Sequence, residues 1–333
     1  MNIINFAKKE IFNRAWMLIF IPLLLTAGCH NHSEDTINIA GNKWLGYQPL
    51  FAAHQIANSS HHAKKKHDHK TELQNIAHQV SATILPSTTS VMRVLGNQQL
   101  DGAMLTLDEA IQFMDKTGMD ICIGLVMDYS NGADALVVNP ETYAERSSKR
   151  LKIGYEATAL GGYMLRRSIE KLGLSAENIK PVLLEPNDQA NAFESGLVDG
   201  VVTFEPFLSD IKKLGAEVVF SSSDIPNEII DIMVFKKDSW KTHTKHFDQL
   251  INILWTSGVQ LIKDNDPEAI KYIQNITGST EDVTQLFQGI HLVSAEESKK
   301  LLKDITGTSI KKMSDYLLNA SLILKPSKLT SCQ

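Results

Sequence analysis

The sequence predicts an α/β protein made of two similar lobes. The first observation is a phrase that occurs twice, because residues 100–108 read LDGAMLTLD and residues 198–205 read VDGVVTFE. The second is that short apolar runs alternate with helical patterns from about residue 36, and the third is that this alternation restarts after Asn139-Pro140. Short apolar runs divided by helices favour a parallel sheet covered on both faces. We therefore expect two α/β units, each with one copy of the phrase.

Each copy of the phrase is expected to form a strand that ends at a ligand crevice. Both copies follow a glycine-bearing helix end, continue as an apolar run, and stop at a Thr with a carboxylate two residues later. Open α/β sheets present polar groups in this way at the carboxyl ends of their strands. Two such edges predict a cleft between the units. The alternative interpretation is that Asp-Gly before an apolar strand recurs by chance.

The first unit is expected to span residues 36–134 and to be completed by residues 233–325. Its strands are expected at residues 37–40, 80–85, 103–106 and 121–127, and its helices at 49–58, 88–95 and 107–116. The later part of the chain turns helical after residue 239. Asp266-Pro267 there is typical of a helix start, and residues 294–297 form a capping box.

The second unit is expected to span residues 135–232. Its strands are expected at residues 151–155, 182–184, 201–204 and 218–220, and its first long helix at 160–172, ended by Gly173. Extended stretches at 134–138 and 231–235 connect the two units in opposite directions. They predict a two-stranded hinge, with the cleft between the lobes.

The N-terminal residues are expected to be a leader that is removed. Lys8, Lys9 and Arg14 precede an apolar run at residues 15–25, which is short for a membrane span. The run ends in Leu-Thr-Ala-Gly-Cys29, which resembles the lipobox of bacterial lipoproteins. Residues 1–28 are then the signal peptide, residues 29–35 a linker, and Cys29 carries a lipid that holds the protein to a membrane surface. A helical membrane anchor is the alternative.

The net charge limits the kind of partner that we expect, and the number of cysteines limits the possible disulfides. The chain has 333 residues, enough for more than one domain, and a formal net charge of −5 at pH 7, which argues against a nucleic-acid partner. Its three cysteines are Cys29, Cys122 and Cys332. Cys122 lies in an apolar run and is expected to be a buried thiol. A disulfide between Cys122 and Cys332 is left open, because nothing in the sequence requires it.

Five short segments carry a family resemblance. They are WLGYQPL at 44–50, DYSNGADA at 128–135, TALGGY at 158–163, TFEP at 203–206 and SDIP at 223–226. Together they resemble the solute-binding lipoproteins and periplasmic proteins of the nitrate, sulfonate, taurine and thiamine-precursor type, whose fold the pyrimidine synthases share. The resemblance implies the type II periplasmic-binding-protein fold with a helical C-terminus, and a monomer on the periplasmic side of a bacterial membrane. It also implies an ABC permease in the inner membrane as partner, and neither a cofactor nor a catalytic residue.

Helix starts supply the first candidate ligand contacts. Ser87 and Thr88, then Thr106, then Thr158 and Gly161 each lie where a predicted strand gives way to a helix. Free N–H groups and hydroxyls at helix starts hold anions or carbonyl oxygens. Ordinary N-capping would explain any one of them. Their shared place at the ends of strands favours a binding site.

Aromatic and acidic side chains supply the remaining candidates. Trp44 and Tyr47 follow the first strand, where a ring covers a ligand, although they are also interpretable as core residues. The other candidates are Asp108, Asn131, Asp134 and Glu205. Asp108 and Glu205 are expected to flank the cleft; otherwise Asp108 caps its helix and Glu205 pairs with Lys212 or a hinge donor. Asn131 and Asp134 either bind ligand or satisfy backbone groups at the hinge.

Two carboxylates at a cleft bias the expected ligand. They would repel a bare sulfonate or nitrate and attract amine, amidine or pyrimidine N–H donors. We therefore favour a substrate-binding component of an ABC importer that captures a thiamine-precursor-like pyrimidine or another nitrogen-containing metabolite by hinge closure. The alternatives are a sulfonate-, taurine- or nitrate-type anion, or a periplasmic sensor that signals to a membrane protein. An enzyme is disfavoured because no nucleophile–base pair is recognisable.

One histidine-rich stretch departs from the resemblance. His61, His62, His67 and His69 lie close to Lys64-Lys65-Lys66. Histidine-rich loops resemble the metal-gathering loops of zinc-binding proteins. Lysines would repel a cation, and the stretch has no Cys and no close histidine pair on a helix. A solvated loop is therefore favoured, and these histidines are weak metal candidates only.

Overall fold

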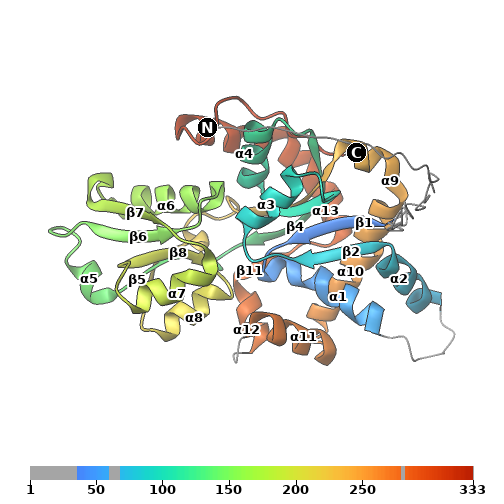
Figure 1. The fold of residues 1–333 in the computed structure, drawn as a ribbon, viewed down its shortest axis with the longest axis horizontal. Helices are drawn as coiled ribbons and strands as arrows, with labels where there is room; N and C mark the ends of the chain where they lie inside the picture. The colour runs from blue at the N-terminus through green and yellow to red at the C-terminus, as the bar shows by residue number, and fades with distance from the viewer. Residues whose placement is uncertain (1–35, 60–67, 279–281, 333) are drawn as a thin grey trace, which may run out of the picture. The chain divides into compact units, whose positions relative to one another are not determined.

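Two β-sheets form the framework of the protein in the computed structural model, which describes residues 36–59, 68–278 and 282–332. Figure 1 shows one sheet in each half of the body from residue 35 onward. The first sheet has the order β11-β4-β10-β3-β1-β2 and the second the order β7-β6-β8-β5-β9. The structure is the type II periplasmic-binding-protein fold that the resemblance implied, with two α/β lobes and a helical C-terminal part.

The first lobe combines early and late segments of the chain. Its strands are β1 (Ile37–Gly41), β2 (Val80–Ile84), β3 (Gly102–Thr106), β4 (Ile121–Ser130), β10 (Ile230–Lys236) and β11 (Ile290–Leu292). Its early helices are α1 (Gln48–Ser59), α2 (Asp68–His78), α3 (Thr88–Gly96) and α4 (Leu107–Thr117). Its late helices are α9 (Lys237–Gln249), α10 (Thr256–Lys263), α11 (Pro267–Thr277), α12 (Val283–Leu286), α13 (Ala295–Asp304) and α14 (Ile310–Asn319).

The second lobe is one continuous stretch of chain. Its strands are β5 (Asp134–Val138), β6 (Leu151–Tyr155), β7 (Ile179–Leu183), β8 (Gly200–Phe204) and β9 (Glu217–Ser221). Its helices are α5 (Pro140–Ala144), α6 (Ala159–Leu172), α7 (Pro186–Glu194) and α8 (Phe207–Lys213). Strand β5 shows why its sheet is covered on both faces. Leu136 and Val138 belong to the core on the α6 side, whereas Ala135 and Val137 belong to the core with α7 and α8.

The expected parallel sheet is found only in part, because both sheets contain parallel and antiparallel pairs. Strand β1 pairs in parallel with β2 and β3, and β6 does so with β7 and β8. Strand β10 is antiparallel to β3 and β4, and β5 is antiparallel to β8 and β9. The chain crosses between lobes at residues 131–133 and 222–229. Each of these strands therefore enters its sheet from the other lobe and runs against its neighbours.

The repeated phrase occupies the same place in both sheets. It forms β3 in one sheet and β8 in the other, and each lies between a parallel strand and a crossing strand. The aspartate of each copy binds the neighbouring parallel strand. Asp101 Oδ2 accepts from the backbone N–H of Asn38 at 2.8 Å, and Asp199 Oδ2 accepts from that of Lys152 at 2.8 Å.

The glycine of each copy makes room for the crossing strand. A Cβ on Gly102 would lie 2.5 Å from the ring of Phe235 in β10, and a Cβ on Gly200 would lie 2.6 Å from the carbonyl oxygen of Val137 in β5. No side chain fits at such distances without movement of a neighbour. The Asp-Gly pair is therefore a requirement of the fold at this position in each sheet.

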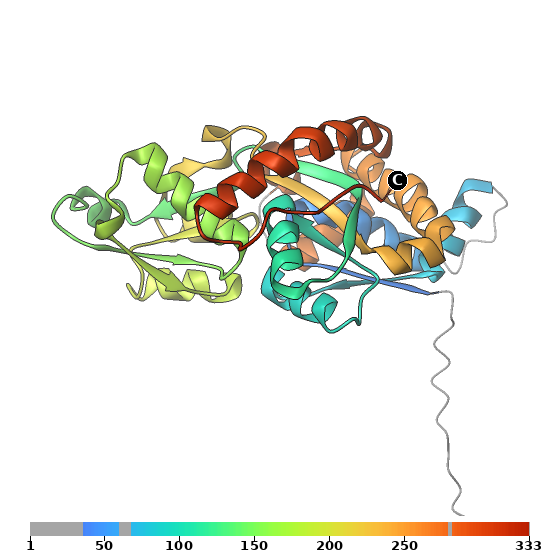
Figure 2. The same ribbon diagram turned by 90° about the horizontal axis from the view of Figure 1, so that it is seen from above.

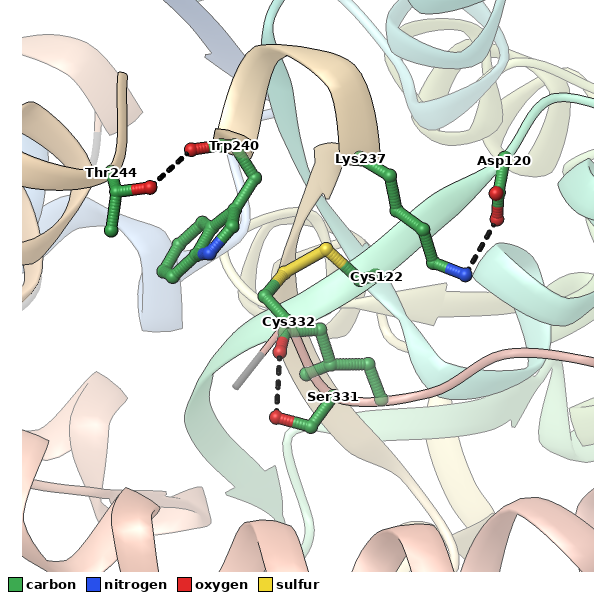
Figure 3. Close-up of a disulfide and its surroundings, with 8 residues drawn as sticks. Asp120, Cys122, Lys237, Trp240, Thr244, Ser331 and Cys332 are labelled. Atoms are coloured by element: carbon green, nitrogen blue, oxygen red, sulfur yellow. Dashed lines mark hydrogen bonds and ion pairs between the residues drawn. A yellow bond between two sulfur atoms is a disulfide. The ribbon is translucent and has the colours of Figure 1, made fainter. Parts of the chain in front are cut away.

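A disulfide fastens the C-terminal tail to the first sheet (Figure 3). It joins Cys122 of β4 to Cys332, with the two Cα atoms 4.9 Å apart and a separation of 210 positions in the sequence. The backbone N–H of Cys332 donates to Ile123 O at 2.9 Å, and Ile123 N–H donates to Thr330 O at the same distance. The expectation that Cys122 is a thiol is wrong: the residue is buried, as expected, but it is bonded.

The C-terminal helix reaches the second lobe before the tail returns (Figure 2). Helix α14 packs against α4 of the first lobe, and its Tyr316 lies edge-on to Tyr163 of α6 with ring centroids 4.8 Å apart. Tyr316 Oη also donates to Glu170 at 3.2 Å. In the part of the chain that the structure describes, no helix combines the length and the apolar character that a membrane crossing needs.

Candidate functional site

A small space lined mostly by buried residues lies between the two sheets. Its volume is about 10 Å³, which is room for about one water molecule. Residues of both lobes line it: Asn42, Trp44, Tyr47, Thr88, Thr106, Glu109, Asp134, Leu160, Phe204 and Asp231. The sequence predicted five of these as ligand contacts, namely Trp44, Tyr47, Thr88, Thr106 and Asp134. The structure brings them together from segments that are far apart in the chain.

The two predicted aromatic residues are held by carboxylates beneath them. The indole Nε1–H of Trp44 lies 3.2 and 3.3 Å from the two carboxylate oxygens of Asp128. Tyr47 Oη donates to Asp231 Oδ1 at 2.6 Å. Trp44 also meets Phe204 of the second lobe edge-on, with ring centroids 6.0 Å apart. Both rings are thus fixed at the wall of the space.

Asp128 and Asp231 form a buried pair on neighbouring strands. They face each other across the β4–β10 ladder, and both side chains are excluded from solvent. Burial raises the pKa of Asp128 to about 8 and raises the pKa of Asp231 well above its usual range, where the charge of Asp128 adds to the effect. Their mutual hydrogen bond lowers the pKa of Asp128 and raises that of Asp231. We infer that Asp231 holds the shared proton.

Asp134 brings a carboxylate from the second lobe to the same space. It starts β5, and its backbone N–H donates to Ser130 Oγ at 3.2 Å. Burial raises the pKa of Asp134 to about 7, and the nearby charges of Asp108 and Glu205 act in the same direction. Asp134 thus stands at the crossing and lines the space, and ligand binding by its carboxylate stays a prediction.

Glu109 lines the space and was missed by the sequence analysis. Its Oε2 accepts from the backbone N–H of Thr106 at 3.1 Å, which closes the start of α4. Its Oε1 is buried without a hydrogen-bond partner among the described residues. Burial is the main cause that raises the pKa of Glu109 well above its usual range, and the nearby charges of Asp108 and Glu156 raise it further. The signal was available, because Thr-x-x-Glu before a helix is a capping box that turns the glutamate back toward the strand end.

The two carboxylates predicted to flank the cleft are not among the residues that line the space. Asp108 is buried, and burial raises its pKa to about 6, but it does not line the space. Glu205 accepts from Ser209 N–H at 3.2 Å and from Ser209 Oγ–H at 2.8 Å, so it stabilises the start of α8. Their charges still influence the site, because both raise the pKa of Asp134, which lines the space.

The remaining predicted contacts serve the helix starts and the crossing. Ser87 Oγ accepts from Ser90 N–H at 3.3 Å and Thr158 Oγ1 from Gly161 N–H at 3.2 Å. Gly161 is required sterically, because a Cβ there would lie 2.2 Å from the carbonyl oxygen of Glu156. Asn131 is exposed, and its backbone N–H donates to Gly289 O at 2.8 Å. None of these four lines the space.

Glu156 is a second missed carboxylate, and it joins the lobes. It follows β6, and its Oε1 accepts from both the N–H and the Oγ1–H of Thr89, in the first turn of α3, at 2.9 and 3.0 Å. Burial raises the pKa of Glu156 to about 7. Nothing in the local sequence distinguishes this glutamate, because its partner comes from the other lobe.

Several predicted residues fall outside the description or away from the cleft. Cys29, His61, His62 and His67 lie outside the described residues, and His69 falls in α2. Among the residues that the structure describes, no group of three His, Cys, Asp or Glu side chains is arranged to hold a metal ion.

The site as a whole is acidic and partly aromatic. No Lys, Arg or His is among the ten lining residues, and none is buried elsewhere in the described chain. Carboxylates without basic partners accept hydrogen bonds and attract positive charge. The arrangement suits a small molecule that offers N–H donors, and it offers no side chain that would neutralise an anion.

Comparisons with known proteins agree with this architecture. A model of the NMT1-like family matches residues 31–276. The alkanesulfonate-binding protein SsuA from Xanthomonas axonopodis pv. citri, bound to MOPS, has a TM-score of 0.68 at 15% identity, covering 88% of this chain and 96% of that one. The zinc-bound ligand-binding component of an ABC-type import system from Staphylococcus aureus has a TM-score of 0.68 at 13% identity, covering 90% and 97%.

A third solved structure has the same fold. The periplasmic aliphatic sulphonate-binding protein SsuA from Escherichia coli has a TM-score of 0.64 at 16% identity, covering 89% of this chain and 96% of that one. No curated protein sequence matches the chain. At these identities the likeness shows the fold, and the ligand has to be argued from the site itself.

Proposed function

This chain belongs to the NMT1-like family, and on that premise we propose that it is the substrate-binding component of an ABC importer. It captures a small organic ligand between its lobes and presents it to a permease, without chemical turnover. The observation that carries the proposal is the space between the two sheets, to which both sheets contribute side chains. Ligand sites of open α/β sheets lie at the ends of their strands, as this one does.

Access to the space requires the lobes to move apart. About 10 Å³ admits one water molecule and no metabolite. Within the described residues, two segments carry the chain from one sheet to the other, at residues 131–133 and 222–229. Closure of two domains about such a pair of connections is a common way to surround a ligand. We propose that the structure corresponds to the closed arrangement of the lobes.

The lining favours a nitrogen-containing ligand over an anion. Glu109, Asp134 and Asp231 accept N–H donors, while Trp44 and Phe204 supply rings beside which a heterocycle packs. A thiamine-precursor-like pyrimidine or another nitrogen-containing metabolite fits this lining. A sulfonate, taurine or nitrate is the alternative, which the names of two structural neighbours support. Such an anion would have to be held by backbone N–H groups and hydroxyls at the helix starts, because the ten lining residues include no Lys, Arg or His.

We propose a place at the membrane for the same protein. The lipobox-like segment ending at Cys29 supports a monomer that is anchored by lipid on the periplasmic side of a bacterial membrane. A sensor that couples the same closure to a membrane signalling protein would use the same cleft. Co-purification with a permease or with a signalling protein separates these two roles.

Tryptophan fluorescence tests solute capture. Trp44 lines the space, whereas Trp240 and Trp255 are buried in the core of the first lobe. We expect a bound pyrimidine or amine to change the emission of the wild-type protein, and the change to disappear in Trp44→Phe. A panel of pyrimidines, amines, sulfonates and nitrate that leaves both emission and thermal midpoint unchanged would contradict the proposed function.

A further inference from the structure

We propose that the cleft recognises its ligand as an organic cation and that Glu109 is the principal charge partner. This inference rests on the proposed function, because it concerns the ligand of the same cleft. It goes further in two respects. It selects a positively charged ligand over a neutral heterocycle, and it assigns the contact to a residue of α4 that is neither Asp108 nor Glu205.

The first support is the hydrogen bonding of Glu109. Its side chain is 2% exposed and lines the space. One carboxylate oxygen is used at the helix start, by the backbone N–H of Thr106 at 3.1 Å. The other makes no hydrogen bond of ordinary distance and angle among the described residues, although the side chain of Thr158 lies near enough to lower the pKa of Glu109. A buried polar atom left without a partner costs free energy, so a donor that enters the space gains both a hydrogen bond and a charge interaction at this atom.

The second support is that neighbouring polar groups of the lining are already paired. Asn42 Nδ2–H donates to Thr88 Oγ1 at 2.8 Å, and Asn42 Oδ1 accepts from the backbone N–H of Trp44 at 2.8 Å. Tyr47 Oη–H is used by Asp231. These groups hold one another in place and have less capacity for a ligand. Of the buried lining atoms in the described residues, Thr106 Oγ1 and Glu109 Oε1 lack a hydrogen-bond partner, and only the carboxylate of Glu109 can carry a negative charge, so Glu109 is the first contact that we assign to a cation.

The third support is the charge of the surroundings. Seven buried carboxylates interact with one another around the space: Asp108, Glu109, Asp128, Asp134, Glu156, Glu205 and Asp231. No Lys, Arg or His side chain is buried with them in the described part of the chain. Like charges in a buried site repel unless they are protonated or meet a cation. A cationic ligand relieves this repulsion, a neutral one does not, and an anion increases it.

The apolar part of the lining defines the rest of the ligand. Trp44, Tyr47, Leu160 and Phe204 form the remaining walls. Aromatic faces and edges accommodate a flat ring, and rings also attract cations. The class that satisfies both kinds of wall is an amidine or a protonated amine attached to a ring or to another compact apolar group.

Matched sets of compounds test the charge directly. Benzamidine, benzamide and benzoate have nearly the same shape and are cationic, neutral and anionic; phenethylamine, phenethyl alcohol and hydrocinnamate form a second set. Their dissociation constants would be measured by calorimetry on the wild type, on Glu109→Gln and on Glu141→Gln. Glu141 is a suitable control, because it is an exposed glutamate in the first turn of α5.

We expect at least one cation to bind about tenfold or more tightly than its neutral and anionic partners. Glu109→Gln should lower the affinity for that cation by about tenfold or more and leave the affinity for the neutral compound unchanged. Glu141→Gln should change neither affinity. The Gln side chain keeps an oxygen for Thr106 N–H, so the variant should fold with a thermal midpoint at or above that of the wild type. Asp134→Asn provides a second variant, in which the same selective loss is expected.

The contrary outcomes separate the two proposals. Equal or tighter binding of a neutral or anionic compound, or an undiminished cation affinity in both Glu109→Gln and Asp134→Asn, overturns the cation inference and leaves solute capture standing. Failure of every compound to bind the wild-type protein at millimolar concentration overturns the cation inference, and the proposed function is contradicted only if the panel of pyrimidines, amines, sulfonates and nitrate fails as well.

Discussion

Gly46 has no side chain, and this leaves room for the carboxylate of Asp128 to lie next to the indole of Trp44. A Cβ on Gly46 would lie 2.0 Å from Asp128 Oδ2 and 2.4 Å from Trp44 Nε1. A methyl group there cannot coexist with the hydrogen bond between these two residues. We expect Gly46→Ala to displace Trp44 from the wall of the cleft, to weaken ligand binding by about tenfold and to lower stability by about 2 kcal/mol. Calorimetry and urea unfolding measure the two effects.

Gly307 provides the matched control. It lies in the helical stretch Ile305–Ser309, and a Cβ there would meet no atom within 4 Å. Gly307→Ala should therefore leave binding unchanged and raise stability by up to about 1 kcal/mol, as is usual for Gly in a helix. If Gly46→Ala behaves like Gly307→Ala, the close packing around Asp128 has no role in the site.

Single residues also show what the sequence could predict of the site. Trp44, Tyr47 and Asp134 were predicted because each stands directly beside a predicted strand, and the structure places all three in the lining. Asp108 was predicted from the repeat, in which a carboxylate follows the Thr of each copy by two residues. On a helix start the side chain three residues after the cap turns back toward the cap, so Glu109 reaches the space and Asp108 does not.

The C-terminal tail is an element whose position depends on one covalent bond. Cys122–Cys332 closes a loop of 210 residues, and the chain-entropy argument assigns such a loop about 5 kcal/mol. We expect the Cys122→Ser/Cys332→Ser variant to lose about 2–5 kcal/mol of unfolding free energy in urea. A reductant should shift the wild type to the midpoint of the variant and leave the variant itself unchanged.

Ser331→Ala is the control for the tail. Ser331 neighbours the disulfide and its backbone takes part in a bridge to Ile123, but it contributes no covalent link. We expect little change in its unfolding midpoint and the same response to reductant as in the wild type. A wild-type midpoint that does not respond to a reductant able to reduce the bond would mean that the disulfide contributes nothing to stability.

The elements differ in how far local sequence determines them. Strands β3 and β8 and the helices after them follow from apolar runs, a capping residue and a terminating glycine, all of which are local. The direction of β5 and β10 is not local, because it depends on which lobe each strand comes from. The pairing of two cysteines 210 residues apart is likewise set by the sheet and not by the spacing.

The two lobes share one arrangement of strands around the repeated phrase, and the two copies of the phrase end at the same space. In both sheets the repeated phrase lies between the parallel strand that precedes it and the strand that crosses from the other lobe. The two copies therefore bring their strand ends to one space, although each copy's Asp-Gly pair serves only its own sheet. The sequence predicted this meeting of the two edges from the repeat. It could not reveal Glu156 and Asp231, whose role depends on contacts between distant segments.

Seven buried carboxylates make the stability of the molecule depend on pH. Burial raises the pKa of Asp108 to about 6, of Asp134 and Glu156 to about 7, and of Asp128 to about 8. Unfolded carboxyl groups titrate near pH 4, so between about pH 4 and pH 8 the folded protein binds more protons than the unfolded chain. The contribution of these groups to the free energy of unfolding is therefore greatest below about pH 4. It is lost as the pH rises through their pKa values in the folded protein.

We therefore expect the unfolding free energy to fall as the pH rises from about 5 to about 8, and urea unfolding at several pH values measures the slope. A carboxyl whose pKa rises on folding from 3.8 to about 6 already accounts for about 3 kcal/mol. Glu109→Gln and Asp134→Asn should flatten the slope, whereas the exposed Glu141→Gln should not. A bound organic cation should restore stability mainly at the alkaline end, because only there are the carboxylates charged. A stability that is constant or rises across this range would show that these groups do not take up protons on folding.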